Sequence, residues 1–158
     1  MSKPQNALSL QVLKKFRIIY GSVRQHFREI EQACGVTGSQ LWIMHEVANT
    51  PGIGVSELAE RLSVHQSTCS QLIEKLVTRE LVIKERSKVD QRRVGQRRSA
   101  GASRLVKKAP APARGVLPEA LNALPVEVVI ALDNSLEAVM MQLQIRDDNL
   151  AERPLSDL

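Results

Sequence analysis

The sequence predicts a mainly α-helical chain with one small β-hairpin. Apolar residues recur at steps of three and four along two long segments, 8–34 and 126–144, which is the spacing of one helix face. The short run Leu81–Ile83 is instead β-type and leads into a polar stretch, 87–96, that can supply a hairpin turn. Three shorter helical segments separate the first long helix from this hairpin.

The first two predicted helices have clear boundary signals. Gly35 follows the first helix, as expected just past a helix C-terminus. Thr37 and Gln40 have the spacing of a capping box, in which each side chain bonds a backbone N–H that the helix leaves unpaired. The helix that they open closes before Pro51. These signals separate a long N-terminal helix from the centre of the chain.

Two further helices and a helix-breaking region follow. Ser56 is the expected N-cap of a helix that ends at Leu62, and the next helix covers about 65–79. Three prolines and a glycine interrupt residues 109–118, so no continuous helix is expected there. We therefore expect three parts: an N-terminal dimerisation helix (1–35), a central lobe (36–100), and C-terminal dimerisation helices (101–158) that are broken at 109–118.

The composition favours a folded, soluble chain without a metal or cofactor. Of 158 residues, 43% are hydrophobic and 25% are charged, which is ordinary for a globular protein. No apolar run approaches the roughly 20 residues that span a bilayer, and the polar start has no signal peptide, so a cytoplasmic location is expected. Two cysteines and three histidines match no ligand motif, and nothing indicates an enzyme.

Positive charge is concentrated in one part of the chain. Residues 79–108 contain eleven Lys or Arg against three acids, a net charge of +8, whereas the whole chain is +5 and the remainder is therefore −3. Such a local positive field indicates a polyanion as partner. The alternative at this point is a solvated basic loop without a partner.

Residues 55–76 have the form of a helix-turn-helix. A short helix is joined by the tight link 63–64 to a second helix whose first turns are small and polar. Such a helix can approach the major groove of DNA closely and present hydrogen-bonding groups to bases and phosphates. The candidate DNA-binding residues here are His65, Gln66, Ser67, Thr68, Ser70, Gln71 and Lys75. The basic hairpin adds Lys88, Asp90, Arg92 and Arg93.

Five stretches of the sequence form one pattern: Val36–Trp42, Val55–Leu62, Ser67–Leu76, Arg79–Arg86 and Asp90–Arg93. Together they resemble the MarR (multiple antibiotic resistance regulator) family of winged helix-turn-helix regulators. The resemblance implies a homodimer joined by its N- and C-terminal helices, with two winged helix-turn-helix lobes on a pseudo-palindromic site in double-stranded DNA. It implies a transcription regulator, and a repressor more than an activator, since the family mostly represses.

The resemblance also assigns roles to individual residues. It implies that Ser67, Thr68, Ser70 and Gln71 face the major groove, that Arg92 enters the minor groove, and that Asp90 fixes the wing by pairing with an arginine. The chain departs from the family pattern at Gly95–Gly101, where arginine stands at a position that is usually apolar. In relatives a small-molecule effector binds between the dimer region and the DNA-binding lobe. Weak candidates for such a crevice are Tyr20, His26, Trp42 and His45, with a core role as the alternative.

Other functions remain as alternatives to a DNA-binding regulator. Cys34 lies at a helix end, where exposure would allow redox sensing, whereas Cys69 fits a small buried hydrophobic position. A winged-helix module that binds proteins instead of specific DNA is a second alternative. A third is an enzyme that uses Cys34 or His45, for which no neighbouring base, carboxylate pair or phosphate loop is visible.

Overall fold

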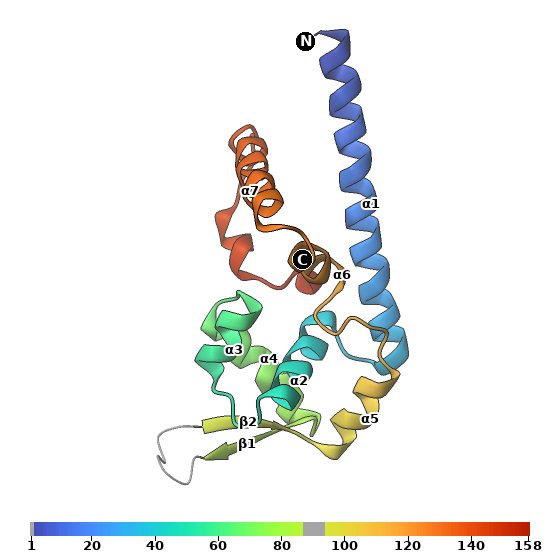
Figure 1. The fold of residues 1–158 in the computed structure, drawn as a ribbon. Helices are drawn as coiled ribbons and strands as arrows, with labels where there is room; N and C mark the ends of the chain where they lie inside the picture. The colour runs from blue at the N-terminus through green and yellow to red at the C-terminus, as the bar shows by residue number, and fades with distance from the viewer. Residues whose placement is uncertain (1, 87–93) are drawn as a thin grey trace.

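The computed structural model describes residues 2–86 and 94–158 and confirms the mainly helical fold with a two-stranded wing (Figure 1). The helices before the wing are α1 (Lys3–Cys34), α2 (Gly38–Asn49), α3 (Val55–Leu62) and α4 (Gln66–Thr78). Strands β1 (Val82–Arg86) and β2 (Val94–Arg98) form the wing. After it come α5 (Ala100–Lys108), α6 (Val116–Asn122), α7 (Val126–Met141) and two short 3-10 helices, η1 (Asp148–Glu152) and η2 (Leu155–Asp157).

The boundaries of α1 and α2 are those that local chemistry dictates. The hydroxyl of Ser2 accepts from the backbone N–H of Gln5, and α1 ends at Gly35 in the left-handed conformation, with φ of 66°. The predicted capping box at Thr37 and Gln40 is present with both hydrogen bonds. Side-chain capping therefore explains both starts without any contact from distant parts of the chain.

The start of α3 differs from the prediction. Gly54, not Ser56, is the N-cap, and it makes no side-chain capping bond because glycine has no side chain. The cause is non-local. Ile53 forms an antiparallel bridge with Gln96, which fixes the preceding backbone in an extended conformation and lets the helix begin at Val55.

The wing packs tightly against the loop before α3. Strands β1 and β2 pair antiparallel, with Val82 opposite Arg98 and Arg86 opposite Val94. A Cβ atom at Gly95 would collide with the backbone of Gly52, so only glycine allows this approach. The backbone of Gln96 exchanges hydrogen bonds with both Gly52 and Ile53. The loop is thus fixed against β2 by a single β-bridge.

One hydrophobic core holds the central helices together. It contains residues from α2, α3, α4 and β1, together with Ile30 and Cys34 from the end of α1 and Ala102 from α5. The buried residues of α1 begin only at Val23, and Figure 1 shows the N-terminal half of α1 extending away from the lobe. This half has large apolar side chains that are 41–61% exposed: Leu8, Val12, Phe16 and Ile19.

The region after the wing differs from the prediction in where its second helix begins. The break predicted at 109–118 is present between α5 and α6, but α6 starts inside it at Val116, with Pro118 in its first turn. Proline is tolerated there because the first N–H groups of a helix have no partner within it. In the described part of the chain, no helix is both long and apolar enough to cross a membrane.

Candidate nucleic-acid interface and adjoining cavity

Helix α4 presents its polar residues to solvent and its apolar residues to the core. Cys69, Leu72, Ile73 and Leu76 are buried. The side chains of Ser67, Gln71 and Lys75, spaced four residues apart, lie on one exposed face, and Gln66 is exposed beside them. Thr68 and Ser70 are half-buried at the margin of this face. The predicted residues of α4 thus form a continuous polar surface.

A tight turn positions this surface. Ser63 ends α3 in the left-handed conformation, with φ of 55°, and the backbone N–H of Val64 bonds the carbonyl of Ala59. His65 then occupies the N-cap position of α4, where its exposed side chain makes no capping bond. The imidazole is therefore free to contact something other than its own helix.

An ion pair joins the wing to α4. The ammonium group of Lys84 on β1 contacts the carboxylate of Glu74 on the exposed side of α4. Both side chains remain partly exposed, so the pair orients the strand more than it stabilises the fold. The predicted residues Lys88, Asp90, Arg92 and Arg93 lie outside the described residues.

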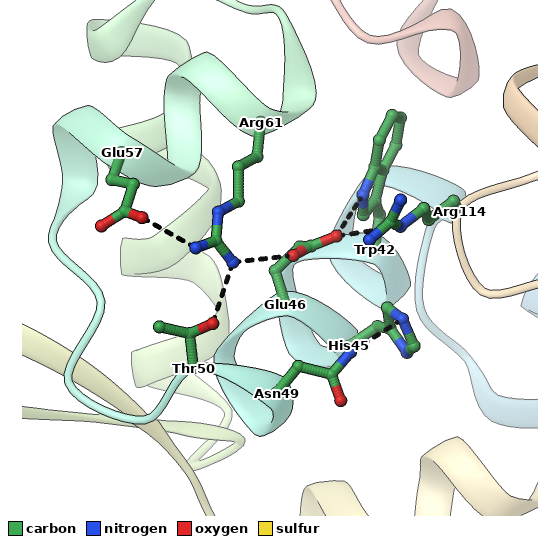
Figure 2. A network of polar contacts seen from close by, with 8 residues as sticks. All are labelled: Trp42, His45, Glu46, Asn49, Thr50, Glu57, Arg61 and Arg114. Carbon is green, nitrogen blue, oxygen red and sulfur yellow. Dashed lines mark hydrogen bonds and ion pairs between the residues drawn. The ribbon is translucent and has the colours of Figure 1, made fainter. Parts of the chain in front are cut away.

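A buried carboxylate connects α2, α3 and the segment before α6 (Figure 2). The side chain of Glu46 is only 3% exposed. Its Oε2 lies 3.1 Å from Nη1 of Arg61 on α3, and its Oε1 lies 3.0 Å from Nε of Arg114. The indole Nε1 of Trp42 donates to the same Oε1 at 3.2 Å. Three elements that are distant in the sequence therefore meet at one carboxylate.

Arg61 extends this network toward the surface. It donates to Oε1 of Glu57 at 2.7 Å and to the hydroxyl of Thr50 at 2.9 Å. Its hydrogen bonds to Glu57 and then Glu46 raise the pKa of the guanidinium, which stays charged. Nothing in the sequence pattern pointed to Glu46, Arg61 or Arg114, because the two ion pairs of Glu46 join residues that are 15 and 68 positions apart.

A cavity of about 240 Å³ lies beside this network. Its walls come from α1, α2, the turn after α3, residues 114–118 and the C-terminal segment, and most of its lining is apolar. Trp42 and Arg114 both line it, so the cavity adjoins the buried carboxylate directly. An apolar cavity with a few polar groups is the usual form of a small-molecule site.

Of the four predicted effector-site residues, Trp42 alone lines this cavity. Nε2 of His26 lies 3.2 Å from the carbonyl oxygen of Pro112, and Nε2 of His45 lies 3.0 Å from the amide of Asn49. Tyr20 is exposed on α1 and contacts Arg24. The structure therefore does not bring these four residues together.

Both cysteines are buried free thiols. The expectation that Cys34 is exposed is wrong, because the end of α1 packs into the core, and Arg79 fastens it there by donating to the carbonyl of Gly35 at 2.8 Å. Burial raises the pKa of Cys34, and it raises the pKa of Cys69 to about 11. Little reactive thiolate exists at either position near neutral pH.

The fold and the α3–α4 surface together define a winged helix-turn-helix lobe. Residues 35–93 match the model of the MarR family, which confirms the resemblance to that family over this segment. Among curated proteins, none matches the chain.

Three solved structures of transcription regulators share this fold. The transcriptional regulator BldR from Sulfolobus solfataricus is 22% identical, with a TM-score of 0.54 over 90% of this chain and 100% of that chain. A mutant MarR from E. coli complexed with operator DNA is 18% identical, with a TM-score of 0.54 over 82% and 96%. A mutant MepR from S. aureus bound to an oligodeoxyribonucleotide is 19% identical, with a TM-score of 0.54 over 84% and 98%.

Proposed function

We propose that the chain is a transcription regulator that binds duplex DNA by placing α4 in the major groove. The observation that carries this proposal is the exposed polar face of α4, in which Ser67, Gln71 and Lys75 align while the opposite face is buried. Small side chains let the helix approach the bases, glutamine can pair bidentately with adenine, and lysine binds phosphate. Two of the structural neighbours are complexes with DNA.

The wing would supply the second contact. The +8 charge of residues 79–108 supports binding to phosphates on either side of the groove that α4 occupies. Lys88, Arg92 and Arg93 are the residues proposed for this contact, with Arg92 in the minor groove and Asp90 fixing the wing. Helix α4 and the wing together would bind one half-site.

The proposed DNA-binding form is a homodimer. Leu8, Val12, Phe16 and Ile19 form an exposed apolar stripe on α1, and Val128, Leu136 and Val139 are exposed on α7. Burying such surface against a second copy would contribute about 25 cal/mol per Å² of apolar area. Residues 1–35 and 101–158 would then be the dimerisation parts, and 36–100 the DNA-binding lobe. Two lobes about 34 Å apart would match the half-sites of a pseudo-palindromic operator.

The cavity supports regulation by a small molecule. It lies between α1 and the turn that precedes α4, so a ligand that prefers one arrangement of these elements would shift the spacing of the two lobes. In this proposal the protein is a repressor that blocks transcription while it is bound to DNA, and ligand binding releases it. Cysteine-based sensing is not favoured, because both thiols are buried.

Matched variants test the role of α4. We expect Gln71→Ala to weaken binding to promoter DNA from the protein's own gene by roughly 5- to 150-fold, the effect of one lost bidentate base contact, while binding to random DNA changes little. Lys75→Gln should weaken binding to both DNAs and reduce the salt slope by about one. Gln32→Ala, an exposed glutamine on α1, is the control. Equal affinities for all four proteins would contradict the placement of α4 in the major groove, and absence of binding by all four would favour the protein-interaction alternative.

A further inference from the structure

The C-terminal segment folds back from α7 onto the DNA-binding lobe. Figure 1 shows it running from α7 past α3 and ending near α6. Arg146 fastens its beginning by contacting Glu137 on α7 at 3.6 Å and Asp148 at 2.5 Å. We call residues 146–158 the strap, since they connect a proposed dimerisation helix with the lobe.

Three polar contacts dock the strap on the lobe. The backbone N–H of Ser39 donates to the hydroxyl of Ser156 at 3.0 Å, and the Ser39 hydroxyl donates to Asp157 at 3.2 Å. The backbone N–H of His65 donates to the carbonyl of Glu152 at 3.1 Å. Ser39 lies in the first turn of α2, where N–H groups lack partners within the helix, so Ser156 acts there as a cap supplied from a distance.

The strap also forms one wall of the cavity. Residues 151 and 153–156 line it, together with Val23 and Phe27 of α1 and Trp42 of α2. Gly38 lies close to both walls, because a Cβ atom there would collide with the ring of Phe27 and would lie 3.2 Å from the Cβ of Ser156. Removing the strap would therefore open the cavity to solvent.

The strap is held by fewer buried side chains than the walls from α1, α2 and α3. No residue of 146–158 is buried, and Leu150 and Leu155 remain 42% and 49% exposed. The helical walls, in contrast, include buried residues such as Val23, Ser39 and Leu62. Segments with few buried apolar contacts open locally while the rest of a protein stays folded.

We propose that the strap is a lid that closes the cavity and opens to admit a small, mainly apolar ligand, and that its opening also releases the start of α4. The second step follows from the contact between Glu152 and His65, because His65 is the N-cap residue of α4. The consequence for DNA rests on the proposed function, whereas the opening of the cavity does not.

Trp42 makes the opening measurable, because it is the single tryptophan of the chain and lines the cavity. Acrylamide, a small neutral quencher of tryptophan fluorescence, serves as the probe. The double variant Ser156→Ala/Asp157→Ala removes both side-chain contacts with Ser39. Glu152→Ala is the control, because only the backbone carbonyl of Glu152 docks the strap and its side chain is exposed.

We expect the double variant to raise the quenching constant of Trp42 at least twofold and to accelerate amide hydrogen exchange at Ser39 and His65 at least tenfold. Glu152→Ala should match the unchanged protein. Amides of Ile43 and Met44 in the core of α2 report global unfolding and should keep their rates. Unchanged quenching in the double variant would overturn the proposal, as would equal acceleration of the core amides.

A DNA measurement tests the coupling to α4. We expect the double variant to change the affinity for promoter DNA at least threefold. Glu152→Ala should change this affinity by less than threefold. Unchanged affinity in a variant whose Trp42 has become accessible would overturn the release of α4. If the unchanged protein binds no DNA, the proposed function fails, and the quenching and exchange results still decide whether the strap is a lid.

Discussion

Substitution of Glu46 by glutamine tests how much the buried network stabilises the fold. The carboxylate accepts from Trp42 and forms ion pairs with Arg61 and Arg114, while its own side chain is 3% exposed. In Glu46→Gln the amide oxygen can replace one acceptor, but the amide NH₂ faces an arginine N–H, donor against donor. The substitution therefore removes the negative charge that faces both arginines, and it puts a donor where one acceptor was.

The expected loss follows from the burial of each group. A hydrogen bond to a charged group contributes about 1.5–3 kcal/mol, and breaking a fully buried pair costs about 3–5 kcal/mol. The two arginine side chains are 34% and 39% exposed, so water can solvate them and reduce the loss. We expect Glu46→Gln to lower the free energy of unfolding by about 2 kcal/mol, and Tm by about 4–8 °C for a chain of this size.

Glu57→Gln is the matched control. Glu57 contacts the same Arg61, but its side chain is 55% exposed, so the loss should be about 0.5 kcal/mol or less. Both variants are compared by calorimetry and urea unfolding at one protein concentration, because a dimer would make Tm depend on concentration. Equal losses for Glu46→Gln and Glu57→Gln would refute the reasoning that burial makes Glu46 the centre of this network.

Three further predictions concern other parts of the chain. The amide group of Gln96 is buried without a hydrogen-bond partner among the described residues. Gln96→Leu should therefore raise the free energy of unfolding, measured in urea, by about 1 kcal/mol. A lower free energy of unfolding would show that the amide has a partner. Because burial raises the pKa of Cys69 to about 11 from an ordinary value of 9.0, its contribution to stability is complete below pH 9 and is lost as pH rises through 11. Between pH 8 and 11, the free energy of unfolding should therefore decline less for Cys69→Ala than for the unchanged protein. Each tenfold difference in proton affinity between the folded and unfolded thiol corresponds to about 1.4 kcal/mol. Parallel curves of unfolding free energy against pH for the two proteins would contradict this prediction. Phe16→Glu should convert the proposed dimer to a monomer in sedimentation at micromolar concentration, while Lys15→Glu, on an exposed polar position beside it, should not. A Phe16→Glu variant that remains a dimer would place the interface elsewhere.

The parts of the fold that depend on neighbouring residues were predictable from the sequence. Gly35 and the capping box at Thr37 act within one helical turn, so their positions in the sequence fix the ends of α1 and α2. The polar face of α4 followed from helical periodicity, because the positions of Cys69 and Leu72 determine which side is buried.

The features that the sequence did not predict depend on distant contacts. The start of α3 is set by pairing of Ile53 with Gln96, more than 40 positions later. The burial of Cys34 follows from packing of the end of α1 into the core, and the network of Glu46 and the docking of the strap on Ser39 join segments far apart in the chain. Periodicity reports which face of a helix is buried, but it does not report which partner covers it.

Binding of the unchanged protein to duplex DNA at two salt concentrations tests the central proposal most directly. Promoter DNA from the protein's own gene is compared with random DNA of equal length. We expect tight binding that weakens steeply with salt, because several phosphates are neutralised, and a clear preference for the promoter DNA. Absence of binding to either DNA at low salt would contradict the assignment of α4 and the wing to DNA recognition.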